Sequence, residues 1–313
     1  MRVTVLAGGV GGARFVKGLR DAVQATDEIT VVVNTGDDLW LSGVRLQPDI
    51  DSILYALAGV NDTERGWGRA GESERVSAEL QAWGAGWPWF TLGDLDLGTH
   101  LARTGWLRDG LAPSQVAERL GARWPIGVRL LPMTDTEVDT HVVVEDGTRM
   151  HFQEWWTRHR ASLRATAFEN PGIDQARPAP GVVEAIEGAD VVVLAPSNPV
   201  VSIGPILAVP GVRAALGRAR RVVGVSPIIG GRVVRGMADA CLAAIGVQTS
   251  ADAVARHYGR RAGGGVLDTW LVAEEDAALA PGLAADGWDV RVEPLWMTDP
   301  STSAALARAA LRP

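Results

Sequence analysis

The chain has 313 residues, 47% of them hydrophobic, and a formal net charge of −7. This size allows one large domain or two modest ones, and the acidic balance argues against a nucleic-acid surface, which would show a basic patch. The single cysteine, Cys241, excludes an internal disulfide and a cysteine-rich zinc site, and no apolar run is long enough to span a membrane, which favours a cytoplasmic protein.

Short apolar runs rich in β-branched residues alternate with helical patterns along the chain. The runs that predict strands are residues 3–7, 29–33, 128–131, 142–144, 191–194, 222–225 and 267–272. The patterns that predict helices include residues 13–23, 51–58, 72–83, 113–119 and 235–245. Because continuously apolar strands are typical of parallel sheets buried on both faces, this alternation predicts a doubly wound α/β fold with a mainly parallel sheet.

The middle of the chain has a different pattern. Residues 142–144 and 149–152 flank Asp146-Gly147, a dipeptide typical of a hairpin turn. Residues 170–181 are rich in proline and alanine and resemble a connector. We therefore expect a smaller α+β lobe at residues 132–180, inserted into a domain formed by residues 1–131 and 181–313.

Four predicted strands end in polar or glycine-rich loops, at residues 8–12, 34–38, 196–199 and 226–231. Ligands of open α/β sheets bind beyond the carboxyl ends of the strands, so these loops predict one polar cleft. The glycines of residues 8–12 allow backbone N–H groups to approach a phosphate at a helix N-terminus, although glycines at strand exits also serve purely structural ends. Arg14 stands where a dinucleotide fingerprint has its third glycine, and Lys17-Gly18 does not fit a P-loop.

Carboxylates are concentrated after the second predicted strand. The cluster consists of Asp37, Asp38, Asp49 and Asp51, and a second one, Asp94 and Asp96, precedes His100. Carboxylate oxygens suit Mg²⁺, whereas any single member can instead cap a helix. The set predicts a site that binds a metal or orients a hydroxyl group.

The order of these segments resembles a known family. The segments are residues 8–14, 33–40, 48–51, 92–96, 99–100, 131–135, 151–153, 196–199 and 226–230. Together they are similar to the 2-phospho-L-lactate transferase family of coenzyme F-420 biosynthesis, over nearly the whole chain. The resemblance implies a Rossmann-like domain with a smaller lobe, a homodimer, and Mg²⁺ as cofactor.

The resemblance also implies the reaction. The acceptor would be the riboflavin analogue 7,8-didemethyl-8-hydroxy-5-deazariboflavin (Fo), and the donor a guanosine diphosphate ester of enolpyruvate or lactate. The terminal ribityl hydroxyl of Fo would attack the phosphorus next to the three-carbon acid, with GMP as the leaving group. The glycine loop and the scarcity of lysine look like the actinobacterial branch, which is associated with the enolpyruvyl donor and with dehydro coenzyme F-420-0 as product.

The resemblance assigns roles to individual residues. Asp37, Asp49 and Asp51 would be catalytic, with Asp51 contacting the ribityl chain and orienting or deprotonating its hydroxyl. Mg²⁺ would be held among Asp37, Asp38, Asp49 and Asp51. Substrate contacts would come from the following residues: Gly9, Val10, Gly11, Gly12, Arg14, Thr35, Asp51, Thr91, Gly93, Asp94, His100, Ser197, Asn198, Ser226 and Gly230. Thr91 stands where some members have a lysine that contacts Fo.

Two other functions remain open at this stage. A related branch with a similar glycine loop contains regulatory proteins that bind nucleotide sugars without catalysing transfer. An NAD(P)-dependent oxidoreductase is a weaker alternative because Arg14 interrupts the dinucleotide fingerprint.

Overall fold

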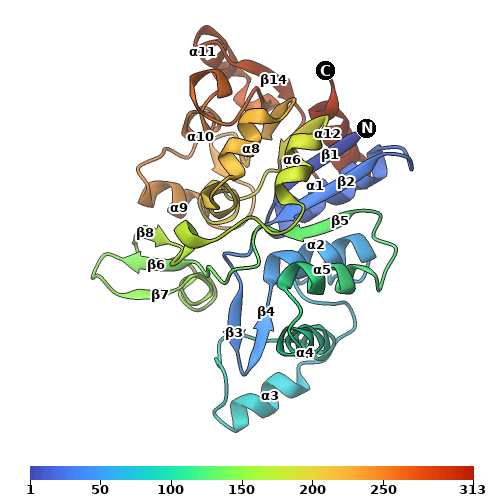
Figure 1. The fold of residues 1–313 in the computed structure, drawn as a ribbon. Coiled ribbons are helices and arrows are strands. Elements are labelled where there is room, and N and C mark those ends of the chain that lie inside the picture. The colour runs from blue at the N-terminus through green and yellow to red at the C-terminus, as the bar shows by residue number, and fades with distance from the viewer.

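The computed structural model describes residues 1–313, and its centre is a seven-stranded sheet (Figure 1). The strand order is β14-β13-β10-β9-β1-β2-β5, and every neighbouring pair is parallel. The strands are β1 (Arg2–Ala7), β2 (Glu28–Val33), β5 (Arg129–Pro132), β9 (Val191–Leu194), β10 (Val222–Val225), β13 (Thr269–Ala273) and β14 (Asp289–Glu293). This sheet confirms the predicted α/β class.

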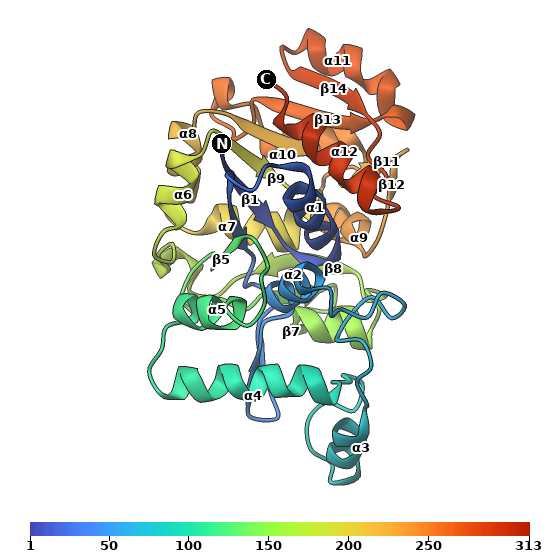
Figure 2. The same cartoon turned by 90° about the vertical axis from the view of Figure 1, so that its right-hand side faces the viewer.

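Helices cover both faces of the large sheet, as the apolar strands predict (Figures 1 and 2). One core lies under α1 (Gly9–Ala22), α2 (Pro48–Ala58), α5 (Pro113–Gly121) and α12 (Pro300–Leu311). The other core lies under α6 (Val182–Gly188), α7 (Gly204–Ala208), α8 (Val212–Arg218), α10 (Ala251–Tyr258) and α11 (Ala280–Ala285). The chain is therefore doubly wound.

The strand order reverses between β1 and β9. From β1 the chain proceeds to β2 and β5 on one side, whereas β9, β10, β13 and β14 follow in order on the other side. Such a switch point leaves a crevice at the carboxyl ends of the two strands, which is where ligands of doubly wound proteins bind. The fold therefore predicts a ligand-binding site at the segments that follow β1 and β9.

A three-stranded antiparallel sheet, ordered β7-β6-β8, lies beside the large sheet. Its strands are β6 (His141–Val144), β7 (Arg149–His151) and β8 (Ala165–Glu169), and the β6–β7 pair confirms the predicted hairpin. Helix α9 (Ala238–Ala244) packs against β8, and a two-stranded ribbon is formed by β11 (Ile228–Ile229) and β12 (Arg232–Val233). The proposed lobe boundaries at residues 132 and 180 stay a prediction.

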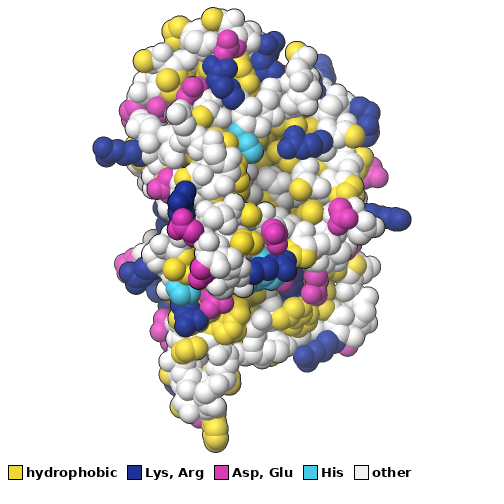
Figure 3. Space-filling model, turned by 90° about the vertical axis from the view of Figure 1, so that its left-hand side faces the viewer, with side chains coloured by type: hydrophobic (Ala, Val, Ile, Leu, Met, Phe, Trp, Pro, Cys, Tyr) yellow, Lys and Arg dark blue, Asp and Glu magenta, His cyan; other side chains and the backbone are white.

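A second projection extends away from the large sheet at the foot of Figure 1. This arm consists of the hairpin β3 (Leu39–Leu41) and β4 (Val44–Leu46) with α3 (Arg75–Ala82) and α4 (Asp94–Arg108). Figure 3 shows hydrophobic atoms at its tip, and Trp83, which follows α3, is 78% exposed. Acidic and basic side chains are interspersed over the rest of the face shown.

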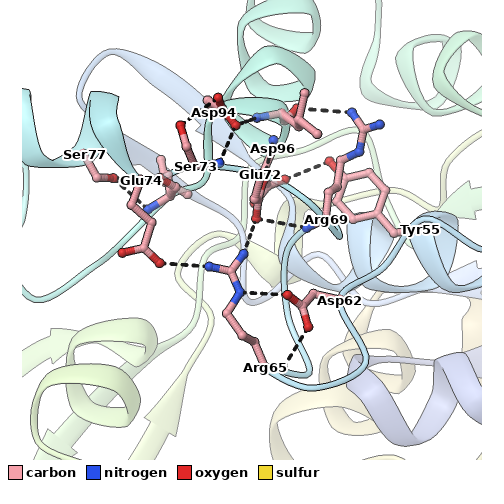
Figure 4. Close-up of polar contacts among 12 residues, drawn as sticks. Tyr55, Asp62, Arg65, Arg69, Glu72, Ser73, Glu74, Ser77, Asp94 and Asp96 are labelled. Carbon is pink, nitrogen blue, oxygen red and sulfur yellow. Dashed lines mark hydrogen bonds and ion pairs between the residues drawn. The ribbon is translucent and has the colours of Figure 1, made fainter.

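The loop before α3 is fastened to the start of α4 by Glu72 (Figure 4). The Glu72 side chain is fully buried and accepts hydrogen bonds from the Arg65 guanidinium, the Arg69 N–H and the Asp96 N–H. Because each donor comes from a different point of the loop or of α4, this one carboxylate fixes the loop against the helix.

Several predictions differ from the structure at element boundaries. Helix α1 begins at Gly9 instead of residue 13, and α2 begins at Pro48 instead of residue 51. Strands β3, β4, β8, β11, β12 and β14 were not predicted, and helices α4, α6, α7, α8, α10, α11 and α12 were not among the helical patterns named above. Short π or 3₁₀ turns complete the chain: Glu154–Arg158, Ile173–Gln175, Pro199–Ile203, Arg261–Gly263 and Glu274–Leu279. No single helix has the length and apolar composition to cross a membrane. Pro199–Ala208 and Val212–Arg218 have that length and composition only when taken together, and the pair is bent by 84°.

Candidate active site

The glycine run after β1 forms the first turn of α1. Gly8 is the N-cap residue without a side-chain cap, and Gly9 has a φ of +63°, a conformation that favours glycine. The run also packs closely: a Cβ at Gly11 would lie 2.7 Å from the Pro196 carbonyl oxygen, and one at Gly12 would lie 2.8 Å from Ser197 Oγ. The glycines therefore let α1 begin directly against the loop that follows β9.

Ser197 locks the two strand exits together. Its Oγ accepts a hydrogen bond from the Gly8 N–H at 3.1 Å and donates one to the Gly8 carbonyl oxygen at 2.7 Å. Ser202 also touches this turn, because a Cβ at Gly8 would lie 2.8 Å from Ser202 Cβ. The structure thus places the predicted loops at residues 8–12 and 196–199 side by side at the switch point.

Asp37 and Asp49 form one carboxylate pair beside the glycine turn. The Asn34 amide donates to Asp37 Oδ1 at 3.1 Å and to Asp49 Oδ2 at 2.9 Å, and the Gly9 N–H also points at Asp49. Burial raises the pKa of Asp49 to about 6; burial first and then the Asp49 charge raise the pKa of Asp37 well above its usual range. Asp49 therefore connects the acidic segment to the start of α1.

Asp38 is buried in a different direction. Its Oδ2 accepts a hydrogen bond from Gln47 Nε2 at 2.7 Å and lies 3.6 Å from the Arg45 guanidinium, while its Oδ1 has no partner. Burial raises the pKa of Asp38 well above its usual range, and the Arg45 charge opposes this effect. The structure does not bring Asp38 into the Asp37–Asp49 pair.

Asp51 faces α4. Its Oδ1 accepts a hydrogen bond from the fully buried Arg103, and His100 Nδ1 lies 3.6 Å from its Oδ2. Burial raises the pKa of Asp51, while the charges of Arg103 and His100 lower it. Asp51 is only 4% exposed, and its Oδ2 has no hydrogen-bond partner.

The network continues through Asp96 to Tyr55. His100 Nε2 lies 3.4 Å from Asp96 Oδ1, and the same oxygen accepts a hydrogen bond from the Tyr55 hydroxyl at 2.8 Å. Burial opposes ionisation of Asp96, but the hydrogen bonds and charge of His100 outweigh it, and the pKa of Asp96 is lowered. Ligand atoms of Asp51, Asp96 and His100 all lie within 4.8 Å of one another. The Arg103 guanidinium already compensates Asp51, and its charge would oppose a metal cation beside that carboxylate.

The lack of a cationic partner favours a metal at Asp37 and Asp49. Asp37 and Asp49 have no cationic partner in the chain, whereas Asp38 pairs with Arg45 and Asp51 with Arg103. Burial and mutual repulsion raise the pKa of both carboxyl groups because ionising them together without a counter-charge is costly, and a hard cation would supply that counter-charge. The donor set of Asp37 and Asp49 therefore fits Mg²⁺ better than that of Asp38 or Asp51.

The other expected site residues lie around the crevice or apart from it. Val10 is half-buried in the first turn of α1, and Arg14 is exposed, without a hydrogen bond or an ion pair. The Asn198 side chain caps the turn that follows β9 by accepting hydrogen bonds from the Val200 and Val201 N–H groups. Because the Arg14 side chain is exposed, it does not crowd α1 against the sheet, as a side chain would at the third position of a dinucleotide fingerprint.

The last predicted loop is internally satisfied. Ser226 Oγ donates to the Ile228 carbonyl oxygen at 2.8 Å and accepts from its N–H, and the Gly230 N–H donates to Asp276 Oδ2 at 2.9 Å. These contacts shape the loop after β10. They leave the side chain of Ser226 with its hydrogen bonds made inside the chain.

Residues 91–94 lead into α4. Thr91 is half-buried, and Gly93 packs against Glu72 so closely that a Cβ would overlap the carboxylate. Asp94 is exposed and accepts hydrogen bonds from the Ser73 N–H and hydroxyl, both at 2.9 Å (Figure 4). These contacts give Gly93 and Asp94 a structural role at the helix start.

The structure adds residues that the sequence interpretation missed, namely Arg45, Gln47, Arg103 and Ser202, and it gives Asn34, expected only as part of the loop at residues 34–38, a specific contact with Asp37 and Asp49. A signal for Arg103 was present, because residues 96, 100 and 103 follow the spacing of one helix face. No similar signal exists for Ser202, since its partner Gly8 comes from a distant segment.

Known proteins resemble this chain over almost its whole length. A family model described as 2-phospho-L-lactate transferase CofD matches residues 3–293. The chain is 53% identical over 317 residues to a phosphoenolpyruvate transferase of Nocardia farcinica, with 99% of this chain and 94% of the relative covered. It is also 53% identical over 321 residues to a phosphoenolpyruvate transferase of Thermobifida fusca, with 99% and 97% covered.

The fold has a solved counterpart. A crystal structure of a member of the UPF0052 family from Bacillus halodurans superposes with a TM-score of 0.64 at 21% identity, covering 99% of both chains. At that identity the likeness supports the fold alone. The family match extends over most of the chain and confirms the resemblance expected from the sequence. The chain belongs to the 2-phospho-L-lactate transferase CofD family.

Proposed function

We propose that this protein transfers a phosphoenolpyruvyl group from a guanosine diphosphate ester to the ribityl hydroxyl of Fo, giving dehydro coenzyme F-420-0 and GMP. The observation that carries the proposal is the uncapped start of α1 at the switch point, beside the buried pair of Asp37 and Asp49. The names of the relatives favour the enolpyruvyl over the 2-phospho-L-lactyl donor, which would give coenzyme F-420-0.

The first turn of α1 supports binding of the donor phosphates. Gly8 supplies no side-chain cap and the turn itself contains no acidic residue. Apart from the Gly8 N–H, which donates to Ser197, and the Gly9 N–H, which points at Asp49, the N–H groups at this helix start can therefore present partial positive charge to an anion. Arg14, exposed one turn further along α1, has no ion-pair partner in the chain and remains available to a phosphate oxygen.

Direct transfer is the simplest mechanism for these residues. Cys241, the only cysteine, is buried, and burial raises the pKa of its thiol to about 12, so it does not supply a thiolate nucleophile. Phosphoryl transfer depends mainly on positioning and on stabilising charge. We propose that Asp51, through its unpartnered Oδ2, orients the ribityl hydroxyl for in-line attack on phosphorus.

Magnesium belongs to this proposal as the cofactor. Asp37 and Asp49 would hold it, because they alone among the four clustered carboxylates lack a cationic partner. When bound, Mg²⁺ would neutralise charge on the phosphate oxygens. Asn34 keeps the two carboxylates together by donating to both.

Mass spectrometry of a reaction mixture tests the proposal. Protein, Mg²⁺ and Fo are incubated with the enolpyruvyl or the lactyl donor, and we expect GMP with the enolpyruvyl product to accumulate faster. Asp49→Asn and Asp51→Asn should abolish turnover, whereas Asp146→Asn, in the exposed β6–β7 turn, should not. Near-normal turnover of both variants would contradict the assignment. Saturable binding of a nucleotide sugar without turnover of Fo would instead favour a regulatory binding protein.

A further inference from the structure

Helix α4 begins without a side-chain cap of its own. Its N-cap residue is Gly93, so the N–H groups of the first turn need acceptors from elsewhere in the chain. The N–H of Asp96, in that first turn, donates at 3.0 Å to Oε2 of Glu72, which lies 24 residues earlier, in the loop before α3. Glu72 therefore caps α4 from outside the helix, and its carboxylate stands at the positive end of the helix dipole.

The chain packs closely around the Glu72 carboxylate (Figure 4). The side chain is fully buried, and its Oε1 accepts hydrogen bonds from Arg65 Nη2 at 2.6 Å and from the Arg69 N–H at 3.0 Å. A Cβ at Gly68 or at Gly93 would overlap the carboxylate, so both positions need glycine. These donors and the close backbone hold the Glu72 carboxylate in one place.

The residue that Glu72 caps also makes the next contact. Asp96 Oδ1 accepts a hydrogen bond from the Tyr55 hydroxyl at 2.8 Å and lies 3.4 Å from Nε2 of His100, one turn further along α4. The other ring nitrogen of His100, Nδ1, lies 3.6 Å from Asp51 Oδ2. His100 is only 2% exposed, so its ring has little room to move between the two carboxyl groups. Because closely packed interiors transmit displacements, a shift of the Asp96 backbone would be passed through His100 to Asp51.

We propose that Glu72 is a positioning residue, which sets the places of His100 and Asp51 by fixing the start of α4. Glu72 contacts neither of these two side chains and acts on them only through Asp96. Asp51 is the residue proposed above to orient the acceptor hydroxyl, so the consequence for catalysis rests on the proposed function. A misplacement of about 1 Å can cost about 100-fold in rate where the reacting groups must be aligned.

Histidine NMR and steady-state kinetics of Glu72→Gln test this role. Glutamine keeps the size of the side chain, but its NH₂ group would face one of the donors, either Arg65 or the Asp96 N–H. The chain has five histidines, and a spectrum of His100→Gln identifies the His100 ring signals in protein with isotope-labelled histidine. At one fixed pH, we expect Glu72→Gln to shift these signals and to lower kcat about 10- to 100-fold, while the KM for Fo changes by less than about threefold.

Further variants separate positioning from a general loosening of the arm. Ser77→Ala removes two hydrogen bonds, of 2.8 and 2.9 Å, that fasten α3 to the segment before α4, and it leaves the contacts of Glu72 in place. Gly68→Ala displaces the Glu72 carboxylate but retains its charge, whereas Gly71→Ala has a similar left-handed backbone and nothing within 4 Å of the new Cβ. We expect Gly68→Ala to resemble Glu72→Gln, and the other two variants to match the wild type. Thermal unfolding checks that each variant is folded, and Gly68→Ala covers the case that Glu72→Gln is not.

The NMR signals and the kinetics can fail separately. Unchanged His100 signals in Glu72→Gln and Gly68→Ala would overturn the proposal, and so would an equal loss of kcat in Ser77→Ala. Shifted signals with a normal kcat would also overturn it, because Glu72 would then stabilise the helix without positioning the reaction. A wild-type protein that does not convert Fo would contradict the proposed function alone, and the His100 signals would then decide whether Glu72 sets the place of that side chain.

Discussion

Removal of Arg103 is expected to be among the most damaging single changes in the arm. The side chain is fully buried and contacts the Asp51 carboxylate, His100 Nδ1 at 2.9 Å and the Arg45 carbonyl oxygen at 3.3 Å. Breaking a buried ion pair by removing one partner costs about 3–5 kcal/mol, because the other charge remains buried and uncompensated. We therefore expect Arg103→Met to lower the free energy of unfolding by about 3–5 kcal/mol at neutral pH.

The same reasoning predicts how a second substitution acts. Arg103→Met combined with Asp51→Asn should be less destabilised than Arg103→Met alone, since the unpaired carboxylate has been removed. Urea unfolding followed by circular dichroism measures Arg103→Met, Asp51→Asn and the double variant. The control is Arg108→Met, exposed on the same helix, whose free energy of unfolding should change by less than about 0.5 kcal/mol. The reasoning is refuted if Arg103→Met costs less than about 1 kcal/mol, or if the two substitutions simply add.

Three further predictions follow from the close packing and burial described above. Gly11→Ala should destabilise the protein by about 1–3 kcal/mol, because the new Cβ would lie 2.7 Å from the Pro196 carbonyl oxygen, whereas Gly98→Ala, with nothing within 4 Å, should stabilise α4 by about 0.5–1 kcal/mol; urea unfolding compares the two. Cys241, whose thiol pKa is raised to about 12 by burial, should resist an aromatic disulfide reagent at about pH 8 in the native protein and react once urea unfolds it; fast native labelling would contradict its burial. Burial raises the pKa of Asp49 from 3.8 to about 6, so between these values the native chain retains a proton that the unfolded chain has lost. In the absence of metal, stability should therefore fall as the pH rises through this range, and by less in Asp49→Asn; identical pH profiles in urea unfolding would contradict this.

The large sheet was predictable from the sequence because its strands are continuously apolar. Residues 191–194 and 222–225 were placed at their observed boundaries, since both faces of these strands are buried. Strand β14 escaped prediction because it is an edge strand with the alternating sequence Asp-Val-Arg-Val-Glu. The hairpin β3–β4 has only three residues in each strand, too few to show a period.

The start of α1 shows why local preferences misplaced a functional element. Glycine is a poor helix former, so the pattern predicts that the helix begins at residue 13. In the structure the helix begins at Gly9. Glycine is required there by tertiary contacts, since a Cβ at Gly8, Gly11 or Gly12 would collide with Asp49, Pro196 or Ser197, respectively. The glycine signal was informative about the site, but the partner segment lies almost 190 residues away and cannot be inferred from local pattern.

The division of the acidic cluster is the most instructive difference, because one rule explains part of it. Residues two apart on a helix do not face each other, so Asp49 and Asp51 must point in different directions once α2 begins at Pro48. A helix that began at residue 51 would leave Asp49 outside it, so the predicted boundary gives no reason to separate the four carboxylates. Arg45 and Arg103 then distinguish them by charge: a guanidinium lies beside Asp38, which shares it with Asp139, and beside Asp51, whereas none lies beside Asp37 or Asp49.

Under the proposed function, this division would give the acidic residues different tasks within one site. The uncompensated pair touches the glycine turn, where negative phosphates would have to be balanced by a cation. The two carboxyl groups beside arginines keep one unpartnered oxygen each, Asp38 Oδ1 and Asp51 Oδ2, and a fixed carboxyl oxygen is suited to accept a hydrogen bond from a hydroxyl group. Under the proposed function, the arginines would favour hydroxyl binding over cation binding at Asp38 and Asp51, which suits a reaction between a phosphate ester and an alcohol.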